Sequence, residues 1–125
     1  MIAPSYTEAV GFEGEDLALI TLKKPLINIK PIKIAKQSSL REGLPVTMVA
    51  KGEMVKTTIS SVQNYSGNLV VFTHGMTAGF CEGDSGGALL VKINNELVLA
   101  GILSAQSEGC ERRTGVSIFP RILQK

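Results

Sequence analysis

The sequence predicts an all-β fold, a small closed antiparallel barrel of six strands. Short runs of apolar or alternating residues, rich in β-branched side chains, recur along the chain. Clusters of Gly, Pro, Asn and Ser separate these runs, and helical periodicity is almost absent. A closed barrel is expected because closure removes the exposed edges that an open sheet of short strands would leave.

The expected strands follow one another at short, regular spacing. An apolar run at residues 17–22 has the length of a buried strand and stops at Lys23-Lys24-Pro25. Between the two strands at 88–93 and 97–103, Asn94-Asn95 tolerates the positive φ of a hairpin turn. The six strands of the barrel are expected at residues 46–50, 54–62, 69–73, 88–93, 97–103 and 115–119.

Composition excludes several functional classes. With 125 residues, 44% of them hydrophobic and 19% charged, the chain is expected to form an ordered domain. A net charge of +2 is too small for a nucleic-acid surface, and no apolar run has the length of a membrane span. One histidine and two cysteines at these spacings do not make a metal-ligand set. We therefore expect no nucleic acid, membrane or metal partner, and no cofactor.

The motif with the clearest chemistry is Gly83-Asp84-Ser85-Gly86-Gly87. A serine flanked by glycines can sit on a tight turn where a substrate backbone approaches closely and where consecutive N–H groups point into one hole. A serine hydroxyl is a weak nucleophile at neutral pH, so it needs a base and a group that orients this base. The motif therefore predicts nucleophilic attack by Ser85 on a carbonyl.

Further residues stand in the same order as in a known family. Asp16-Leu17-Ala18-Leu19-Ile20 precedes the motif, Gly101-Ile102-Leu103-Ser104 and Cys110 follow it, and Cys81 lies just before it. Over most of its length the chain thus resembles a trypsin/chymotrypsin-family serine protease. The resemblance implies that Ser85 is the nucleophile and Asp16 the catalytic acid. It also implies an oxyanion hole from the N–H groups of Gly83 and Ser85, and a pairing of Asp84 with the amino terminus that activation liberates.

The family's catalytic histidine has no counterpart in this sequence. His74 is the single histidine, and it follows Asp16, whereas the family's histidine precedes the aspartate. We expect His74 to be a structural histidine at the surface or half buried. The resemblance then implies a fragment in which residues 1–39 are a remnant of the N-terminal barrel and the crossing segment. Residues 40–125 would be the C-terminal barrel, and the missing N-terminal protease segment would be a partner.

The resemblance also assigns a specificity pocket and a disulfide. Its implied substrate-binding residues are Gly79, Phe80, Glu82, Ser104, Ala105, Gln106 and Gly115. Gly79 stands at the pocket base, where trypsin-like members carry an aspartate, so small or medium apolar side chains are expected as substrates rather than Lys or Arg. Cys81 and Cys110 match a pair that the family joins, and reduced buried cysteines are the alternative. A disulfide would place the protein in a secreted or periplasmic compartment.

Two functions from different classes follow. The first is a serine endopeptidase acting on protein or peptide substrates, although this chain alone is expected to be inactive. The second is a non-catalytic protease homologue that serves as a protein-binding module. A hydrolase of the nucleophile-elbow type is not favoured, because no helical pattern follows Ser85.

Overall fold

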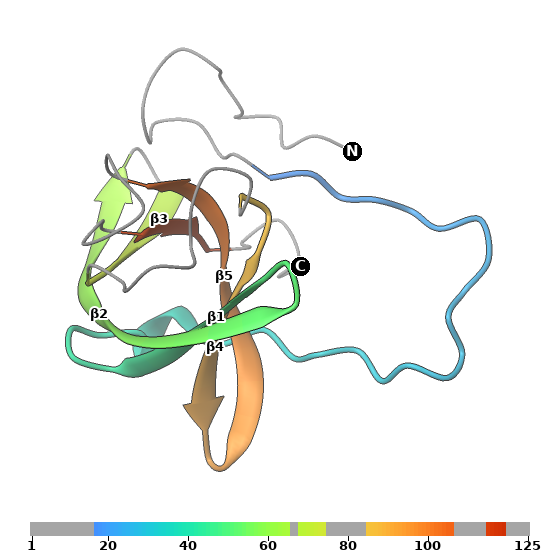
Figure 1. Cartoon of the computed structure of the whole chain (residues 1–125), viewed down its shortest axis with the longest axis horizontal. Helices are drawn as coiled ribbons and strands as arrows, with labels where there is room; N and C mark the ends of the chain where they lie inside the picture. The colour runs from blue at the N-terminus through green and yellow to red at the C-terminus, as the bar shows by residue number, and fades with distance from the viewer. Residues whose placement is uncertain (1–16, 66–67, 75–84, 107–114, 120–125) are drawn as a thin grey trace.

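The computed structural model describes residues 17–65, 68–74, 85–106 and 115–119 (Figure 1). Within these ranges the chain forms one short 3-10 helix, η1, and a single β-sheet. The elements are η1 (Gln37–Ser39), β1 (Pro45–Ala50), β2 (Glu53–Tyr65), β3 (Asn68–Thr73), β4 (Ala88–Ile93), β5 (Glu96–Gln106) and β6 (Gly115–Ile118). In this part of the chain no helix is long and apolar enough to cross a membrane.

The strands form an antiparallel sheet that curls into a closed ring. Its order is β1-β2-β3-β6-β5-β4, and β4 pairs with β1 to close it. The β1–β2, β2–β3, β4–β5 and β5–β6 pairings join strands consecutive in the chain, whereas β3–β6 and β1–β4 join strands far apart, and β3 does not pair with β4. The prediction of an all-β antiparallel fold is confirmed. Every predicted barrel strand coincides with an observed one to within a few residues, and only β2 and β5 extend clearly further.

Two hairpins turn through residues with positive φ. Lys51 and Gly52 join β1 to β2 with φ values of 50° and 74°. Asn94 and Asn95 join β4 to β5 with φ values of 49° and 67°, as predicted for this pair. Two consecutive positive φ angles match the right-handed twist of the flanking strands, so these tight turns fix the register of both hairpins.

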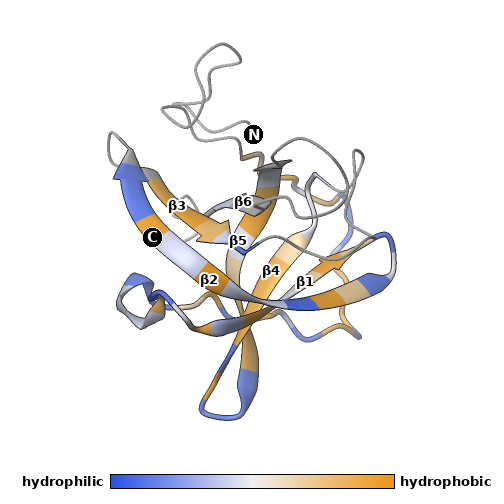
Figure 2. Ribbon diagram, turned by 60° about the vertical axis from the view of Figure 1, so that its left-hand side comes forward, coloured by the Kyte–Doolittle hydropathy of each residue, from blue (hydrophilic) through white to orange (hydrophobic). Residues whose placement is uncertain are grey.

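The core lies inside the ring and is built by alternation. In β1, Val46, Met48 and Ala50 are buried, while the residues between them face outward. In β4, Leu89 and Val91 point inward in the same way. The hydropathy colouring of Figure 2 shows apolar residues concentrated along the strands and polar ones at the hairpin tips. Residues with period two therefore supply the apolar interior that stabilises the barrel.

The segment before η1 differs from expectation. The predicted strand at residues 17–22 is not a strand, and this stretch belongs to a long extended excursion from the barrel (Figure 1). Leu17 is buried, but the side chains of residues 18–22 are exposed, and Ile20 is 80% exposed. An apolar run becomes a strand only where neighbouring strands accept its backbone hydrogen bonds, and the six described strands already pair with one another in a closed ring.

The same segment returns to the barrel at residues 33–35. Ile34 forms an isolated parallel bridge with Leu99 of β5. The Ala35 N–H donates to the Leu99 carbonyl at 2.8 Å, and the Leu99 N–H donates to the Lys33 carbonyl at 2.8 Å. Ala35 is buried in the core cluster. These residues are therefore joined to the barrel, because β5 extends its pairing to them.

Candidate active site

Ser85 lies on the turn that leads into β4. The Gly86 N–H donates to the Leu103 carbonyl at 2.7 Å, and the Leu103 N–H donates to the Gly87 carbonyl at 2.8 Å. These two bonds attach the turn to β5 just before Ser104. The glycine-rich motif is thus a turn held by main-chain hydrogen bonds at one end of the barrel.

Gly86 has a backbone conformation that favours glycine. Its φ is +91°, a value that residues with a Cβ rarely adopt. A Cβ placed there would meet no atom within 4 Å, so the requirement comes from the backbone and not from crowding. The sequence indicated that a glycine was needed beside the serine, and the structure identifies the dihedral angle that needs it.

The Ser85 hydroxyl is accessible and weakly held. Ser85 is exposed, and its Oγ donates to the Ser104 carbonyl oxygen at 3.5 Å. This distance is at the long end for a hydrogen bond from a hydroxyl. A hydroxyl that is exposed and loosely bonded can turn toward an incoming carbonyl with little loss of interaction energy.

The strands assigned to the substrate pocket meet beside Ser85. Gln106 of β5 pairs with Gly115 of β6, and Ala105 pairs with Val116. The register shifts between Leu103 and Ala105, so the irregularity falls at Ser104. Such a bulge bends a strand and redirects its side chains, and bulges are frequent next to active sites. The structure therefore brings five predicted site residues to one end of the barrel: Ser85, Ser104, Ala105, Gln106 and Gly115.

His74 lies at the end of β3 and is exposed, which confirms the prediction of a surface position. Its N–H donates to the Thr58 carbonyl at 3.0 Å, and its carbonyl accepts a bond from Thr57 Oγ1 at 3.4 Å. In the ring, β3 and β4 stand three strands apart in either direction. The described hydrogen bond of Ser85 goes to Ser104, so His74 is not its partner in this structure.

Several predicted site residues lie outside the described residues. They are Asp16, Gly79, Phe80, Cys81, Glu82, Gly83, Asp84 and Cys110. The catalytic acid, the Gly83 half of the oxyanion hole, the pocket base and the disulfide stay predictions. Within the described ranges, no group of three or more His, Cys, Asp or Glu residues is placed to hold a metal ion.

Two buried polar residues near this end of the barrel were not singled out from the sequence. Thr73 of β3 and Ser117 of β6 are both fully buried. Thr73 Oγ1 contacts the Met48 sulfur at 3.8 Å, whereas Ser117 Oγ has no hydrogen-bond partner among the described residues. The alternation of faces along a strand could have indicated that Ser117 is buried. Ser117 lies two residues before Phe119, which is buried in the core, so both side chains point to the same face of the sheet.

The described part of the chain is an antiparallel β-barrel that presents an exposed serine on a glycine turn. Comparison with known families makes the assignment specific. The sequence model of the family Trypsin matches residues 1–123, and the chain therefore belongs to the trypsin family. Searches of curated proteins and of solved structures gave no match.

Proposed function

We propose that this domain supplies the nucleophile of a serine endopeptidase. The observation that carries the proposal is the exposed Ser85 hydroxyl, on a turn bonded to β5 where β5 and β6 meet. Family membership supports it, since trypsin-family domains are typically peptidases. A rigid barrel end that presents an accessible hydroxyl beside two strand ends suits a site that must bind a peptide and attack its carbonyl.

The proposed chemistry is acyl transfer. Ser85 Oγ attacks the scissile carbonyl carbon while a base takes the hydroxyl proton, and the N–H groups of Gly83 and Ser85 bind the oxyanion. The tetrahedral intermediate collapses when the base returns the proton to the leaving amine. Water then attacks the acyl–Ser85 ester by the same steps and releases the acid product.

Among the described residues, no base lies within hydrogen-bond reach of the Ser85 hydroxyl. We propose that the base is a histidine on a protease segment outside these 125 residues, oriented by Asp16. Residues 1–39 would pack against that segment, and residues 40–125 would form the nucleophile-bearing barrel. The exposed side chains of the excursion offer the apolar surface for this packing. They are Leu19, Ile20, Leu22, Leu26, Ile27, Ile29 and Ile32.

The pocket, compartment and disulfide complete the proposal. With Gly79 at the pocket base, a buried cationic substrate side chain would lack a carboxylate partner, so small or medium apolar side chains are the proposed substrates. A Cys81–Cys110 disulfide and secretion or periplasmic export are proposed together. Intact-mass measurement of oxidatively folded protein before and after reduction tests the bond, and two free thiols would contradict it.

A fluorophosphonate probe tests the nucleophile. The 125-residue chain alone should react with it slowly, whereas the longest protein that contains this sequence together with an upstream histidine should be labelled at Ser85. Ser85→Ala should abolish this labelling, and Ser38→Ala, at an exposed serine within η1, should leave it unchanged. Stoichiometric labelling of Ser85 in the chain alone would show that the base lies within it.

A second function is a non-catalytic homologue that binds proteins. The observation that favours it is that the Ser85 hydroxyl bonds a backbone carbonyl and no base among the described residues. In that case the longest protein would bind peptides that fit the pocket, yet neither fluorophosphonate labelling nor peptide cleavage would occur. Labelling and cleavage that both depend on Ser85 would exclude this function.

A further inference from the structure

A groove of about 730 Å³ runs over the outer face of the barrel, between β1, β2 and the β4–β5 hairpin. It lies away from the glycine turn. Ser85 precedes the start of β4, and Lys92, near the end of that strand, lines the groove. Lys92 is four steps along the strand from Ala88, about 13 Å at the usual rise. The lining residues are Pro45, Val46, Thr47, Met54, Lys56, Thr57, Lys92, Asn95, Glu96 and Leu97.

Two large apolar side chains of the groove face solvent. Met54 of β2 is 64% exposed and Leu97 of β5 is 42% exposed. Both lie on strands whose inward side chains already fill the core, so they contribute nothing to the interior. Apolar side chains that gather in a concave site gain free energy when a ligand removes them from water. Methionine adds a flexible side chain that adapts to different apolar partners.

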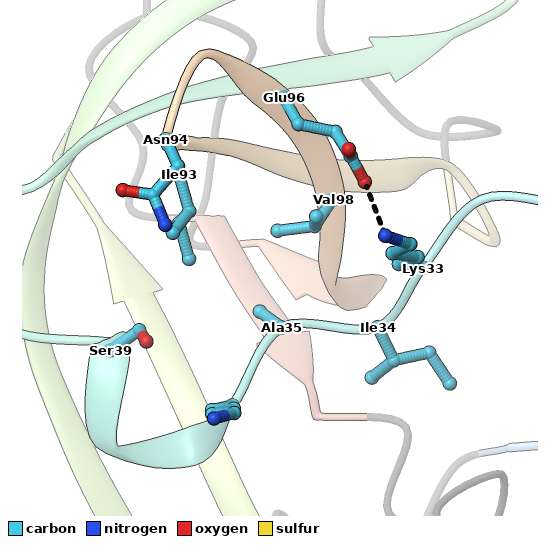
Figure 3. Close-up of a pocket in the computed structure, with 9 residues that line it drawn as sticks. Lys33, Ile34, Ala35, Ser39, Ile93, Asn94, Glu96 and Val98 are labelled. Carbon is cyan, nitrogen blue, oxygen red and sulfur yellow. Dashed lines mark ion pairs between the residues drawn. The ribbon is translucent and has the colours of Figure 1, made fainter.

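Two lysines accompany these apolar side chains. Lys56 is the register partner of Thr47, which lies on the central strand of the groove, and Lys92 is the register partner of Leu97. Within the part of the chain that the structure describes, neither lysine forms an ion pair. The one carboxylate of the lining, Glu96, instead pairs with Lys33 at 3.5 Å, on the other side of the hairpin (Figure 3). Among the described residues, the groove thus presents two lysines that have no ion-pair partner.

We propose that this groove is a docking site for an extended peptide that carries an apolar anchor side chain between carboxylates. The anchor would cover Met54 and Leu97, and the carboxylates would face Lys56 and Lys92. Charge complementarity of this kind sets the orientation of a peptide and speeds its association. The site is separate from the proposed catalytic function, and either proposal can fail without the other.

The test uses the full chain and a fluorescein-labelled peptide, Glu-Asp-Phe-Glu-Glu-Leu, followed by fluorescence anisotropy. We expect saturable binding that weakens as salt screens the carboxylates. The double variant Lys56→Glu/Lys92→Glu should weaken binding at least about tenfold. The matched control Lys24→Glu/Lys30→Glu reverses two exposed lysines outside the groove and should bind within about twofold of the parent. Circular dichroism melts establish that each variant is folded.

Further variants of the peptide and the protein separate the apolar contribution to binding from the electrostatic one. Replacing the Phe of the peptide by Ala should weaken binding about tenfold. The double variant Met54→Ser/Leu97→Ser of the protein should have the same effect. A peptide in which Lys replaces each Glu should not bind. A peptide with benzoylphenylalanine at the anchor should crosslink to Met54 or Leu97. Equal loss in both charge-reversal variants, or crosslinks elsewhere, would overturn the site. If the protein binds phosphatidylserine vesicles but not the peptide, the groove is a site for a lipid surface, and the proposal of a peptide ligand is refuted.

Discussion

Removing the hydroxyl of Ser117 should stabilise the barrel. Ser117 is 0% exposed, and its Oγ has no partner among the described residues. Its register partners are Val71 of β3 and Leu103 of β5, both buried apolar residues. Folding therefore strips water from this hydroxyl and offers it only hydrocarbon on both flanks. An unsatisfied buried polar group costs about 1–3 kcal/mol.

Two opposing contributions determine how much Ser117→Ala changes the free energy of unfolding. The variant removes the desolvation cost and leaves a void about the size of one oxygen atom, which costs about 0.3–0.5 kcal/mol at the usual cavity coefficient. The net expectation is a gain of about 1 kcal/mol in the free energy of unfolding. For a domain of this size, such a gain corresponds to a rise of about 3–5 °C in Tm.

Urea unfolding followed by circular dichroism measures the effect, with the midpoint and the slope fitted separately. Ser38→Ala, at an exposed serine, is the matched control and should change stability by less than about 0.5 kcal/mol. A loss of 1 kcal/mol or more in Ser117→Ala, at unchanged slope, would show that the buried hydroxyl stabilises the fold. It would mean that the hydroxyl makes a hydrogen bond in solution that outweighs its burial.

The remaining predictions use the same assay. Gly86→Ala should destabilise the chain by about 1–2 kcal/mol, because φ is +91° there while the space is open; an unchanged midpoint would show that the turn relaxes freely. Met48→Ala, in the core, should cost about 2–5 kcal/mol, whereas Met54→Ala, at an exposed position, should cost less than about 0.5 kcal/mol. Similar losses from both would contradict the assigned faces. Asn95→Gly should stabilise the hairpin by about 0.5 kcal/mol, since φ is 67° there, and a destabilised variant would show that the asparagine side chain contributes.

Residues that act locally were predictable from the sequence. The short apolar runs at 46–50 and 88–93 predicted the strands β1 and β4, because strand composition and the turn residues that bound it are local features. Asn94-Asn95 predicted its own turn, since its positive φ depends on two adjacent residues. The motif around Ser85 predicted a glycine turn with an accessible serine for the same reason.

For residues 17–22, the local sequence pattern was not sufficient to predict the secondary structure. Their apolar run has the composition of a strand, yet Ile20 is 80% exposed and the segment is not a strand in this structure. Strand formation depends on a partner edge, and the pattern of one segment carries no information on whether that edge is present. The anchoring of residues 33–35 to Leu99 could not be foreseen either, because it is a bridge between segments more than sixty residues apart.

The fold class, the order of strands along the chain, the hairpin turns and the serine motif were predictable from the sequence, because each depends on residues close together in the chain. The pairings of β3 with β6 and of β1 with β4 followed only from the folded barrel, as did the contact of Ser85 with Ser104 and the position of His74 three strands away. The same holds for Ser117, buried without a hydrogen-bond partner among the described residues, and for the two lysines beside an apolar groove. These relations arise when the sheet closes, since closure chooses among distant partners that all have compatible patterns.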